Sequence, residues 1–308
     1  MSEYRHTTVL KDEVTDLLGV TSGKVYFDAT LGGGGHSRAT LEKGGIVIAT
    51  DMDEDAIRNA DGLKSEYRER FFPVKGNFRD AVKIVRQTGF ERVDGVVADL
   101  GLSSHQIEND SRGFSFMRDG PLDMRFDRSA PNTAYQFLKG IDAESLAYGL
   151  RYFADIKKAE KIAQYIKVYF SGNMPDNTII FSEYLSRCRY LRGSKRINPA
   201  TRVFMAIRMM VNDEVGNLTE FLVKLPLMMN YHSTAAVISF HSAEDRIVKD
   251  IFRKFTRQKY IEAGDKLFRA RLINKKVIVP KRDEIRMNPR SRSARLRAIS
   301  FTQAEKEE

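Results

Sequence analysis

The sequence predicts an α/β protein with a doubly wound, mostly parallel sheet and a helical insertion. Short β-rich apolar runs alternate with helical patterns in the first part of the chain, and four consecutive glycines follow the first run. The alternation stops at Asp99 and resumes at Ala235, 136 residues later. A strand–helix–strand unit is complete in roughly 30 residues. An insertion is therefore expected between these two positions.

Seven runs rich in apolar and β-branched residues are expected as strands. They are Val25–Asp28, Ile46–Thr50, Phe71–Lys75, Val93–Ala98, Ala235–Phe240, Lys276–Val279 and Leu296–Phe301. Helical periodicity fills the intervals between the first four, at Ser37–Lys43, Asp53–Tyr67 and Arg79–Gln87. Strands and helices in strict alternation are typical of a parallel sheet covered on both faces.

The insertion has apolar residues at helical spacing and little strand pattern. Its expected helices are Asn132–Leu138, Ala143–Phe153, Ile156–Phe170 and Thr178–Arg189. A long amphipathic pattern over Ala200–Val215, continuing towards Leu227, returns the chain to the sheet. A small helical domain is predicted here.

Composition excludes several classes of protein. The apolar fraction of 42% and charged fraction of 30% are ordinary for a soluble globular protein. No apolar run approaches the ~18 residues of a membrane span, and the N-terminal sequence is unlike a signal or transit peptide, so a cytoplasmic protein is expected. The single cysteine, Cys188, cannot form an internal disulfide, and the five histidines show no metal-ligand spacing.

The net charge of +10 is concentrated in two runs. Lys266–Arg297 holds twelve Lys/Arg against two acids, and Arg187–Arg202 holds six basic residues and no acid. Either run alone is explained equally well by a solvated basic face. Two such runs beside a cofactor loop favour a nucleic-acid partner.

The glycine run Gly32–Gly35 is predicted to be a ligand-binding loop. Glycine permits positive φ and close approach of a ligand to the backbone at the start of a helix. Asp51, about 20 positions later, stands where α/β nucleotide sites place the acceptor for ribose hydroxyls. The dinucleotide pattern would need glycine or alanine at Ser37 or Arg38, which disfavours a nicotinamide-dependent oxidoreductase.

Asp28, the glycines, Asp51 and Asp99 together resemble the class I S-adenosylmethionine-dependent methyltransferases. In such enzymes the glycine loop passes the methionine part of the cofactor, and a residue after the third strand lies near the adenine, a role that suits Phe78. Ligands bind at the carboxyl ends of the strands, so the transferred methyl group is expected to face Asp99, Ser103, Ser104 and Gln106.

Longer motifs narrow this resemblance to one family. The chain resembles the RsmH/MraW family in His6–Leu10, the Gly-Gly-Gly-Gly-His-Ser loop, Asp99-Leu-Gly, Arg112–Arg125, Pro199–Arg202, Ser239–Lys249 and Asn288–Arg297. That family methylates the exocyclic N4 of a cytidine in the decoding region of small-subunit ribosomal RNA. The resemblance implies a methyltransferase core over 1–106 and 207–308, with a helical substrate-recognition domain over 107–206.

The same resemblance implies the site residues. Cofactor contacts carry over to Gly34, Gly35, His36, Asp51, Phe78, Asp99 and Gln106. Asp99 is also expected to accept a hydrogen bond from the cytosine amine and so to act in catalysis. The turn Asn230–Thr234 and the helices of the insertion depart from the family pattern, which bears on RNA fit more than on the reaction.

RNA contacts are expected from the two basic runs, because phosphate contacts position a single-stranded or flipped nucleotide. The expected residues are Arg187, Arg189, Arg192, Lys195, Arg196, Arg290, Arg292 and Arg295. Phe114, Phe116 and Tyr190 could stack on bases or belong to the core. His241 could contact the base or ribose, with a structural role the stronger interpretation.

Two alternatives stay open at this point. One is a non-catalytic ribosome-assembly or RNA-binding protein that retains the methyltransferase fold, and the other is a methyltransferase acting on DNA or protein. The expected partner is ribosomal RNA or the small ribosomal subunit, and a homodimer is left open.

Overall fold

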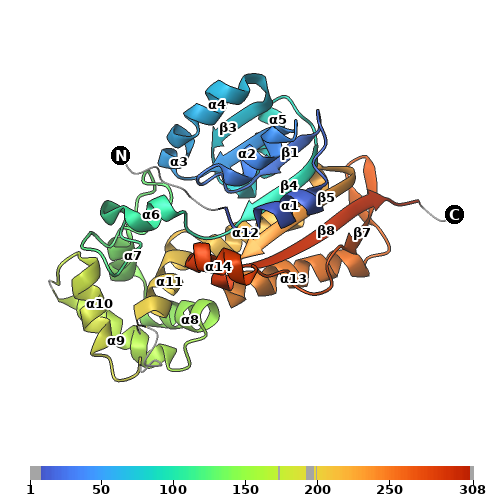
Figure 1. The fold of residues 1–308 in the computed structure, drawn as a ribbon. Helices are drawn as coiled ribbons and strands as arrows, with labels where there is room; N and C mark the ends of the chain where they lie inside the picture. Colours follow the sequence, from blue (N-terminus) through green and yellow to red (C-terminus); the bar gives the residue numbers. More distant parts are fainter. Residues whose placement is uncertain (1–7, 173, 192–197, 199, 306–308) are drawn as a thin grey trace. The chain divides into compact units, whose positions relative to one another are not determined.

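The computed structural model describes residues 8–172, 174–191, 198 and 200–305. The chain forms two compact units (Figure 1). The sheet unit comprises residues 1–101 and 215–308, and the helical unit comprises residues 102–214. In the described part of the chain, no helix has both the length and the apolar character needed to cross a membrane.

One mixed sheet forms the centre of the sheet unit, with the order β3-β2-β1-β4-β5-β8-β7-β6. Its strands are β1 (Val25–Asp28), β2 (Ile46–Asp51), β3 (Phe71–Lys75), β4 (Val93–Asp99), β5 (Met229–Ser239), β6 (Ile261–Ala263), β7 (Lys266–Leu272) and β8 (Arg295–Gln303). The first five pair in parallel, whereas β8, β7 and β6 pair antiparallel to their neighbours.

The expected sheet of seven strands is wrong in its C-terminal part. Lys276–Val279 is not a strand, because only Ile278 pairs there, through an isolated bridge to Leu296. The antiparallel pair β6 and β7 was not predicted. It brings the number of strands in the described sheet to eight.

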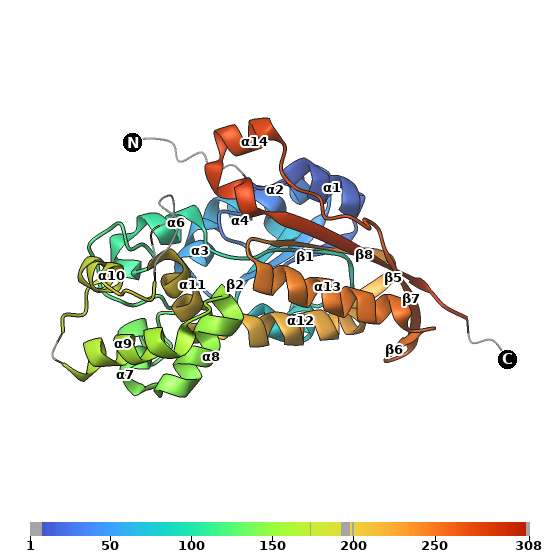
Figure 2. The same cartoon turned by 90° about the horizontal axis from the view of Figure 1, so that it is seen from below.

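Helices cover both faces of the sheet, because the strands bury side chains on both sides. The helices of this unit are α1 (Lys11–Leu18), α2 (Gly35–Glu42), α3 (Glu54–Asn59), α4 (Asp61–Tyr67), α5 (Ala81–Gln87), α12 (Glu214–Met228), α13 (Ser242–Arg257) and α14 (Arg282–Met287). Figure 2 shows α1 and α2 on one side of the sheet and α12 and α13 on the other. The helix expected over Asp53–Tyr67 is divided at Ala60 into α3 and α4.

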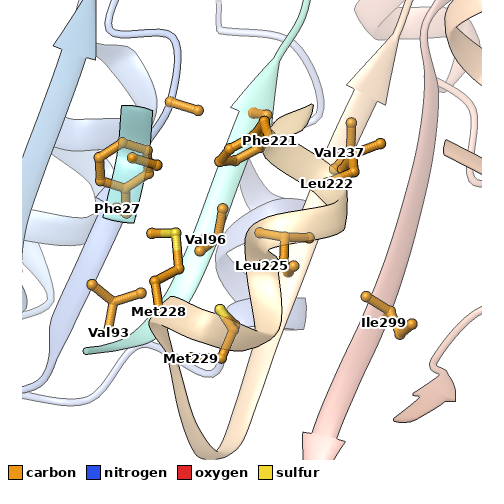
Figure 3. Close-up of a cluster of buried hydrophobic side chains, with 14 of the residues drawn as sticks. Phe27, Val93, Val96, Phe221, Leu222, Leu225, Met228, Met229, Val237 and Ile299 are labelled. Atoms are coloured by element: carbon orange, nitrogen blue, oxygen red, sulfur yellow. The ribbon is translucent and has the colours of Figure 1, made fainter. Parts of the chain in front are cut away.

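Side chains alternate along each strand between the two faces of the sheet, and each face has a hydrophobic core of its own. Phe27 and Val96 join α12 side chains such as Phe221 and Leu225 in the larger cluster (Figure 3). Tyr26, which precedes Phe27, packs on the opposite face with residues of α1. Adjacent strand residues point to opposite faces of a sheet, so one short strand contributes to both layers.

The helical unit contains α6 (Ser104–Glu108), α7 (Ala134–Gly140), α8 (Ala143–Ala154), α9 (Ala159–Ser171), α10 (Thr178–Ser186) and α11 (Ala200–Val211). These helices enclose a core of their own. Side-chain caps begin four of them: Ser103, Thr133, Asp142 and Asn177 accept from backbone N–H groups of α6, α7, α8 and α10. The expected run from Ala200 towards Leu227 is interrupted after α11, where Asp213 has φ 46°.

Candidate active site

Three aspartates mark the carboxyl edge of the parallel strands. Asp28 ends β1, Asp51 ends β2 and Asp99 ends β4. Because β1 lies between β2 and β4, the three side chains belong to neighbouring strand ends of one sheet. This edge is where α/β folds bind their ligands.

The glycine loop joins β1 to α2 and is tied to β2. The backbone N–H of Leu31 donates to the Thr50 carbonyl at 2.9 Å, and the N–H of Gly32 donates to Asp51 Oδ2 at 2.9 Å. Gly34 has φ 75° and precedes α2, and no side chain among the described residues caps that helix. A Cβ on Gly34 would also lie 2.6 Å from Leu63 Cδ1. The loop therefore needs glycine here and leaves the first N–H groups of α2 without a side-chain cap.

Asp51 is held by two backbone donors. Its Oδ2 accepts from Gly32 and its Oδ1 accepts from the Asp53 N–H at 2.9 Å. Burial raises the pKa of Asp51 to about 6, and the hydrogen bonds from Asp53 and Gly32 only partly oppose that rise. At neutral pH the carboxylate is ionised and oriented, as an acceptor for two ligand hydroxyls must be.

Asp28 links the end of β1 to the start of α2. It is 2% exposed, and its carboxylate accepts from Ser37 Oγ at 2.7 Å and from the Thr30 N–H at 3.1 Å. Burial raises the pKa of Asp28, with His36 and these donors opposing the rise. Thr30 in turn accepts, at its Oγ1, the backbone N–H of Asp99 at 2.7 Å. Asp28 and Thr30 thereby connect the glycine loop to the end of β4.

His36 and Asp99 form a pair with unused hydrogen-bonding capacity. His36 Nε2 lies 3.5 Å from Asp99 Oδ2, and the two side chains are 5% and 19% exposed. Within the described residues, both ring nitrogens of His36 and Asp99 Oδ1 have no hydrogen-bond partner. Leaving buried polar atoms unsatisfied costs about 1–3 kcal/mol each. These orphaned atoms at the ligand-binding edge fit a polar ligand that the site is built to receive.

The other expected cofactor residues are placed as follows. Phe78 follows β3, is half-buried and packs against Phe221 with ring centroids 5.3 Å apart. Gln106 belongs to the helical unit, where its side chain and that of Ser103 form the capping box of α6. The structure therefore gathers His36, Asp51 and Asp99 within the sheet unit, and places Gln106 in the other unit.

The expected RNA-binding residues divide between the two units. Arg187 and Arg189 are exposed at and beyond the end of α10, whereas Arg192, Lys195 and Arg196 lie outside the described residues. Arg290 and Arg292 are exposed on the 3-10 turn Pro289–Ser293. Arg295 is already in use, because it donates with Arg297 to Asp245 at distances of 2.7–3.2 Å.

Three further side chains have structural roles. His241 is the N-cap of α13, where it forms a capping box with Glu244, which favours the structural interpretation of this histidine. Phe114 is buried in the core of the helical unit, and Phe116 packs against Phe204 with centroids 5.4 Å apart. Both phenylalanines are therefore core residues.

Arg112, at the start of the long family motif, is fully buried. Its guanidinium donates to the carbonyls of Arg125 and Phe126 at 2.9 and 3.0 Å and lies 5.6 Å from the centre of the Phe114 ring. Sequence reasoning missed this role, and it missed those of Thr30 and Ser37 at the site. The Arg112–Arg125 motif indicated the family, but nothing in its sequence predicted that Arg112 is buried in the core.

Sheet order separates this fold from the dinucleotide-binding fold. A dinucleotide-binding sheet runs 3-2-1-4-5-6 with parallel strands. Here the neighbour of β5 is the antiparallel β8. With the glycine loop, the strand-end aspartates and the failed dinucleotide spacing, the fold and site define a class I methyltransferase.

The chain belongs to the MraW methylase family, whose model matches residues 3–302. One relative, the "Ribosomal RNA small subunit methyltransferase H" of Anaeromyxobacter sp. (strain K), is 39% identical over 97% of this chain and 98% of its own. A protein of the same name from Carboxydothermus hydrogenoformans is 39% identical over 96% of this chain and 97% of its own.

The chain also has distant similarity to solved structures. An rRNA methylase from Streptococcus thermophilus superposes with a TM-score of 0.40 at 11% identity, covering 95% of this chain and 94% of its own. A SAM-dependent O-methyltransferase from Thermotoga maritima gives a TM-score of 0.40 at 9% identity, covering 99% and 70%.

Proposed function

We propose that this protein transfers a methyl group from S-adenosylmethionine to ribosomal RNA of the small subunit, at the exocyclic N4 of a cytidine in the decoding region. Membership of the MraW methylase family over residues 3–302 carries the proposal. The relatives named as ribosomal RNA small subunit methyltransferases, aligned over nearly the whole chain, support the RNA substrate. The N4 position rests on the resemblance of the Arg112–Arg125 and Asn288–Arg297 motifs.

The residues present at the strand edge fit this cofactor. Asp51 would accept the two ribose hydroxyls, the loop over Gly34 and Gly35 would pass the methionine part, and Phe78 would contact the adenine. The orphaned atoms of His36 and Asp99 offer polar partners at the same edge. When bound, the cofactor supplies a methyl group on a positively charged sulfur. Gln106 stays a prediction as a cofactor contact, since its side chain belongs to the helical unit.

Asp99 is the proposed partner of the reacting amine. Methyl transfer to nitrogen is an in-line displacement, so catalysis depends mostly on alignment of the nitrogen lone pair. Asp99 Oδ1 lacks a partner in the described structure and could accept a hydrogen bond from the amine. That bond would favour a pyramidal nitrogen, whose lone pair is no longer delocalised into the cytosine ring. The methylated amine then loses a proton. Asp99 and the neighbouring His36, 3.5 Å away, are groups able to hold it.

Substrate recognition is assigned to residues outside the strand edge. The amine of cytosine is paired in a duplex, so the target must be single-stranded or flipped. We propose the predicted region 107–206 as the recognition domain and Arg187, Arg189, Arg290 and Arg292 as phosphate contacts, with Arg192, Lys195 and Arg196 as further ones. Arg295 is the weakest of the set because Asp245 already engages it. A cytoplasmic location and association with the small ribosomal subunit are also predictions.

The test is to map methylated cytidines in small-subunit ribosomal RNA from cells with and without this gene. We expect loss of a single N4-methylcytidine, with restoration by the wild-type gene and not by an Asp99→Ala variant. Unchanged methylation in the deletion strain would refute the proposal. In calorimetry, failure of the purified protein to bind S-adenosylmethionine would instead support a non-catalytic RNA-binding protein.

A further inference from the structure

Three cations of the helical unit converge on one tyrosine ring. Lys158 Nζ, Lys161 Nζ and Arg189 Cζ lie 5.9, 5.2 and 4.8 Å from the centre of the Tyr190 ring. Arg189 also donates a hydrogen bond to the Tyr190 hydroxyl at 2.5 Å. The two lysines belong to the start of α9, about 30 residues before Tyr190 in the sequence, so only the fold of this unit brings the four together. We call them the Tyr190 cluster.

The cluster has no carboxylate partner among the described residues. None of its three cations forms a described ion pair, and all three side chains are exposed. Glu160, the acid nearest to the lysines in sequence, is paired with Arg151. The segment 192–197, which follows Tyr190, contains three basic residues and no acid.

Like charges gathered at one place repel unless something compensates them. The π face of Tyr190 compensates in part, since a cation over an aromatic ring gains about 0.5–1 kcal/mol at an exposed site. The remaining positive charge calls for an external anion. The ring already contacts three cations, so it is suited to holding them in place more than to stacking on a base.

We infer that the Tyr190 cluster binds the phosphate backbone of the RNA substrate and that Tyr190 positions its cations. This inference rests on the proposed function and adds Lys158, Lys161 and Tyr190 to the RNA-binding surface. A chain of phosphates is the favoured ligand because three flexible cations surround one ring without the fixed, buried donors that a single small anion requires. The predicted contacts Arg187 and Arg189 are close in sequence to the same ring.

The test measures the salt dependence of RNA binding by the full-length protein. The probe is a transcript of the decoding region of small-subunit ribosomal RNA, and the variants are Lys158→Ala/Lys161→Ala and the control Lys83→Ala/Lys254→Ala. The control removes the same charge from exposed lysines outside the cluster. Each single-stranded phosphate contact contributes about 0.7 to the slope of log K against log salt, so the cluster variant should lose about 1.4. If the variant and the wild type bind RNA equally at 1 M salt, this difference in slope makes the variant bind about 25-fold more weakly at 0.1 M.

A second pair of variants tests the role of Tyr190. Tyr190→Phe keeps the ring and should bind RNA about as well as wild type, whereas Tyr190→Leu should weaken binding several-fold without a change in thermal unfolding. An unchanged slope in the cluster variant, or an equal loss in the control, would overturn the inference while leaving the proposed function intact. Calorimetry with S-adenosylhomocysteine should give the same affinity for all variants. If the wild-type protein bound no RNA, the proposed function would fail together with the inference.

Discussion

Protonation of Asp51 should weaken cofactor binding as the pH falls. Burial raises the pKa of this carboxyl to about 6. Only the ionised form can accept hydrogen bonds from both ribose hydroxyls while it also accepts the N–H groups of Gly32 and Asp53. Cofactor binding and proton binding at Asp51 therefore compete.

The size of the effect follows from the pKa. At pH 5 about one Asp51 in eleven is ionised, so the Kd should be about tenfold higher than at pH 7, or about 1.4 kcal/mol. The rise in Kd approaches tenfold for each pH unit only well below pH 6. Above pH 7 it should be nearly constant, as far as Asp51 is concerned.

The assay is calorimetry with S-adenosylhomocysteine, which binds without turnover, on wild type and Asp51→Asn between pH 5 and 8. The variant should bind roughly 10- to 100-fold more weakly at pH 8, because a charge-assisted hydrogen bond is worth about 1.5–3 kcal/mol. It should also lack the pH dependence near 6. Asp28, which is also buried, is unchanged in the variant, so the difference between the two curves isolates Asp51. A wild-type Kd that is flat from pH 5 to 8 would refute the reasoning.

The same carboxyl affects stability with a defined sign. A raised pKa means that the folded state holds the proton more tightly than the unfolded state, so this group costs stability as the pH rises from 3.8 to about 6. That cost reaches about 3 kcal/mol above pH 6. Urea denaturation of the cofactor-free protein should show a pH-dependent difference between wild type and Asp51→Asn confined to this window.

Three further predictions concern individual residues. Asp99→Ala should lower kcat by about 10²–10³-fold with little change in thermal unfolding, and undiminished methyl incorporation would remove Asp99 from the mechanism. Gly113→Ala should destabilise the protein by at least about 2 kcal/mol in urea denaturation, because Gly113 has φ 67° and a Cβ would overlap the Pro121 carbonyl and lie 2.7 Å from Asp123 N. Gly140→Ala, where a Cβ meets nothing within 4 Å, should be harmless; equal effects of the two would contradict this account. Asp245→Asn should cost about 3 kcal/mol at pH 7, since it breaks the partly buried pairing with Arg297 and Arg295. Although burial favours its protonated form, these arginines hold the pKa of Asp245 below its usual range, so the difference from wild type should shrink as the pH falls through that range.

The parallel part of the sheet was predictable because its strands are buried on both faces and are therefore continuously apolar. All four residues of β1 are buried, and four consecutive residues of β4, Gly95–Ala98, are buried as well. The antiparallel β7 was not, because Arg269 and Arg271 alternate there with the buried Phe268 and Ala270. In the sequence, these arginines belong to the basic run Lys266–Arg297, which obscures the alternation typical of a strand. The expected strand over Lys276–Val279 is wrong, because this segment offers only a single bridge, at Ile278.

The site was predictable to the extent that the order of the strands determines it. Asp51 and Asp99 end parallel strands, so their closeness to the glycine loop follows from the topology. The role of Thr30 depends on a tertiary hydrogen bond, in which its hydroxyl oxygen accepts the Asp99 N–H, and no local sequence pattern predicts that bond. The same holds for the buried Arg112 and for the Tyr190 cluster, whose members come from separate segments of the chain.

Strand β8 has a consequence for the synthesis of the protein. It is the last strand in chain order, yet it lies inside the sheet between β5 and β7. Until residues 295–303 have left the ribosome, one edge of β5 is unpaired, and β7 and β6 cannot join the sheet. The helical unit, encoded earlier over 102–214, can bury its own core before that moment. A truncation before Arg295 should therefore spare the helical unit and leave an aggregation-prone strand edge in the sheet unit.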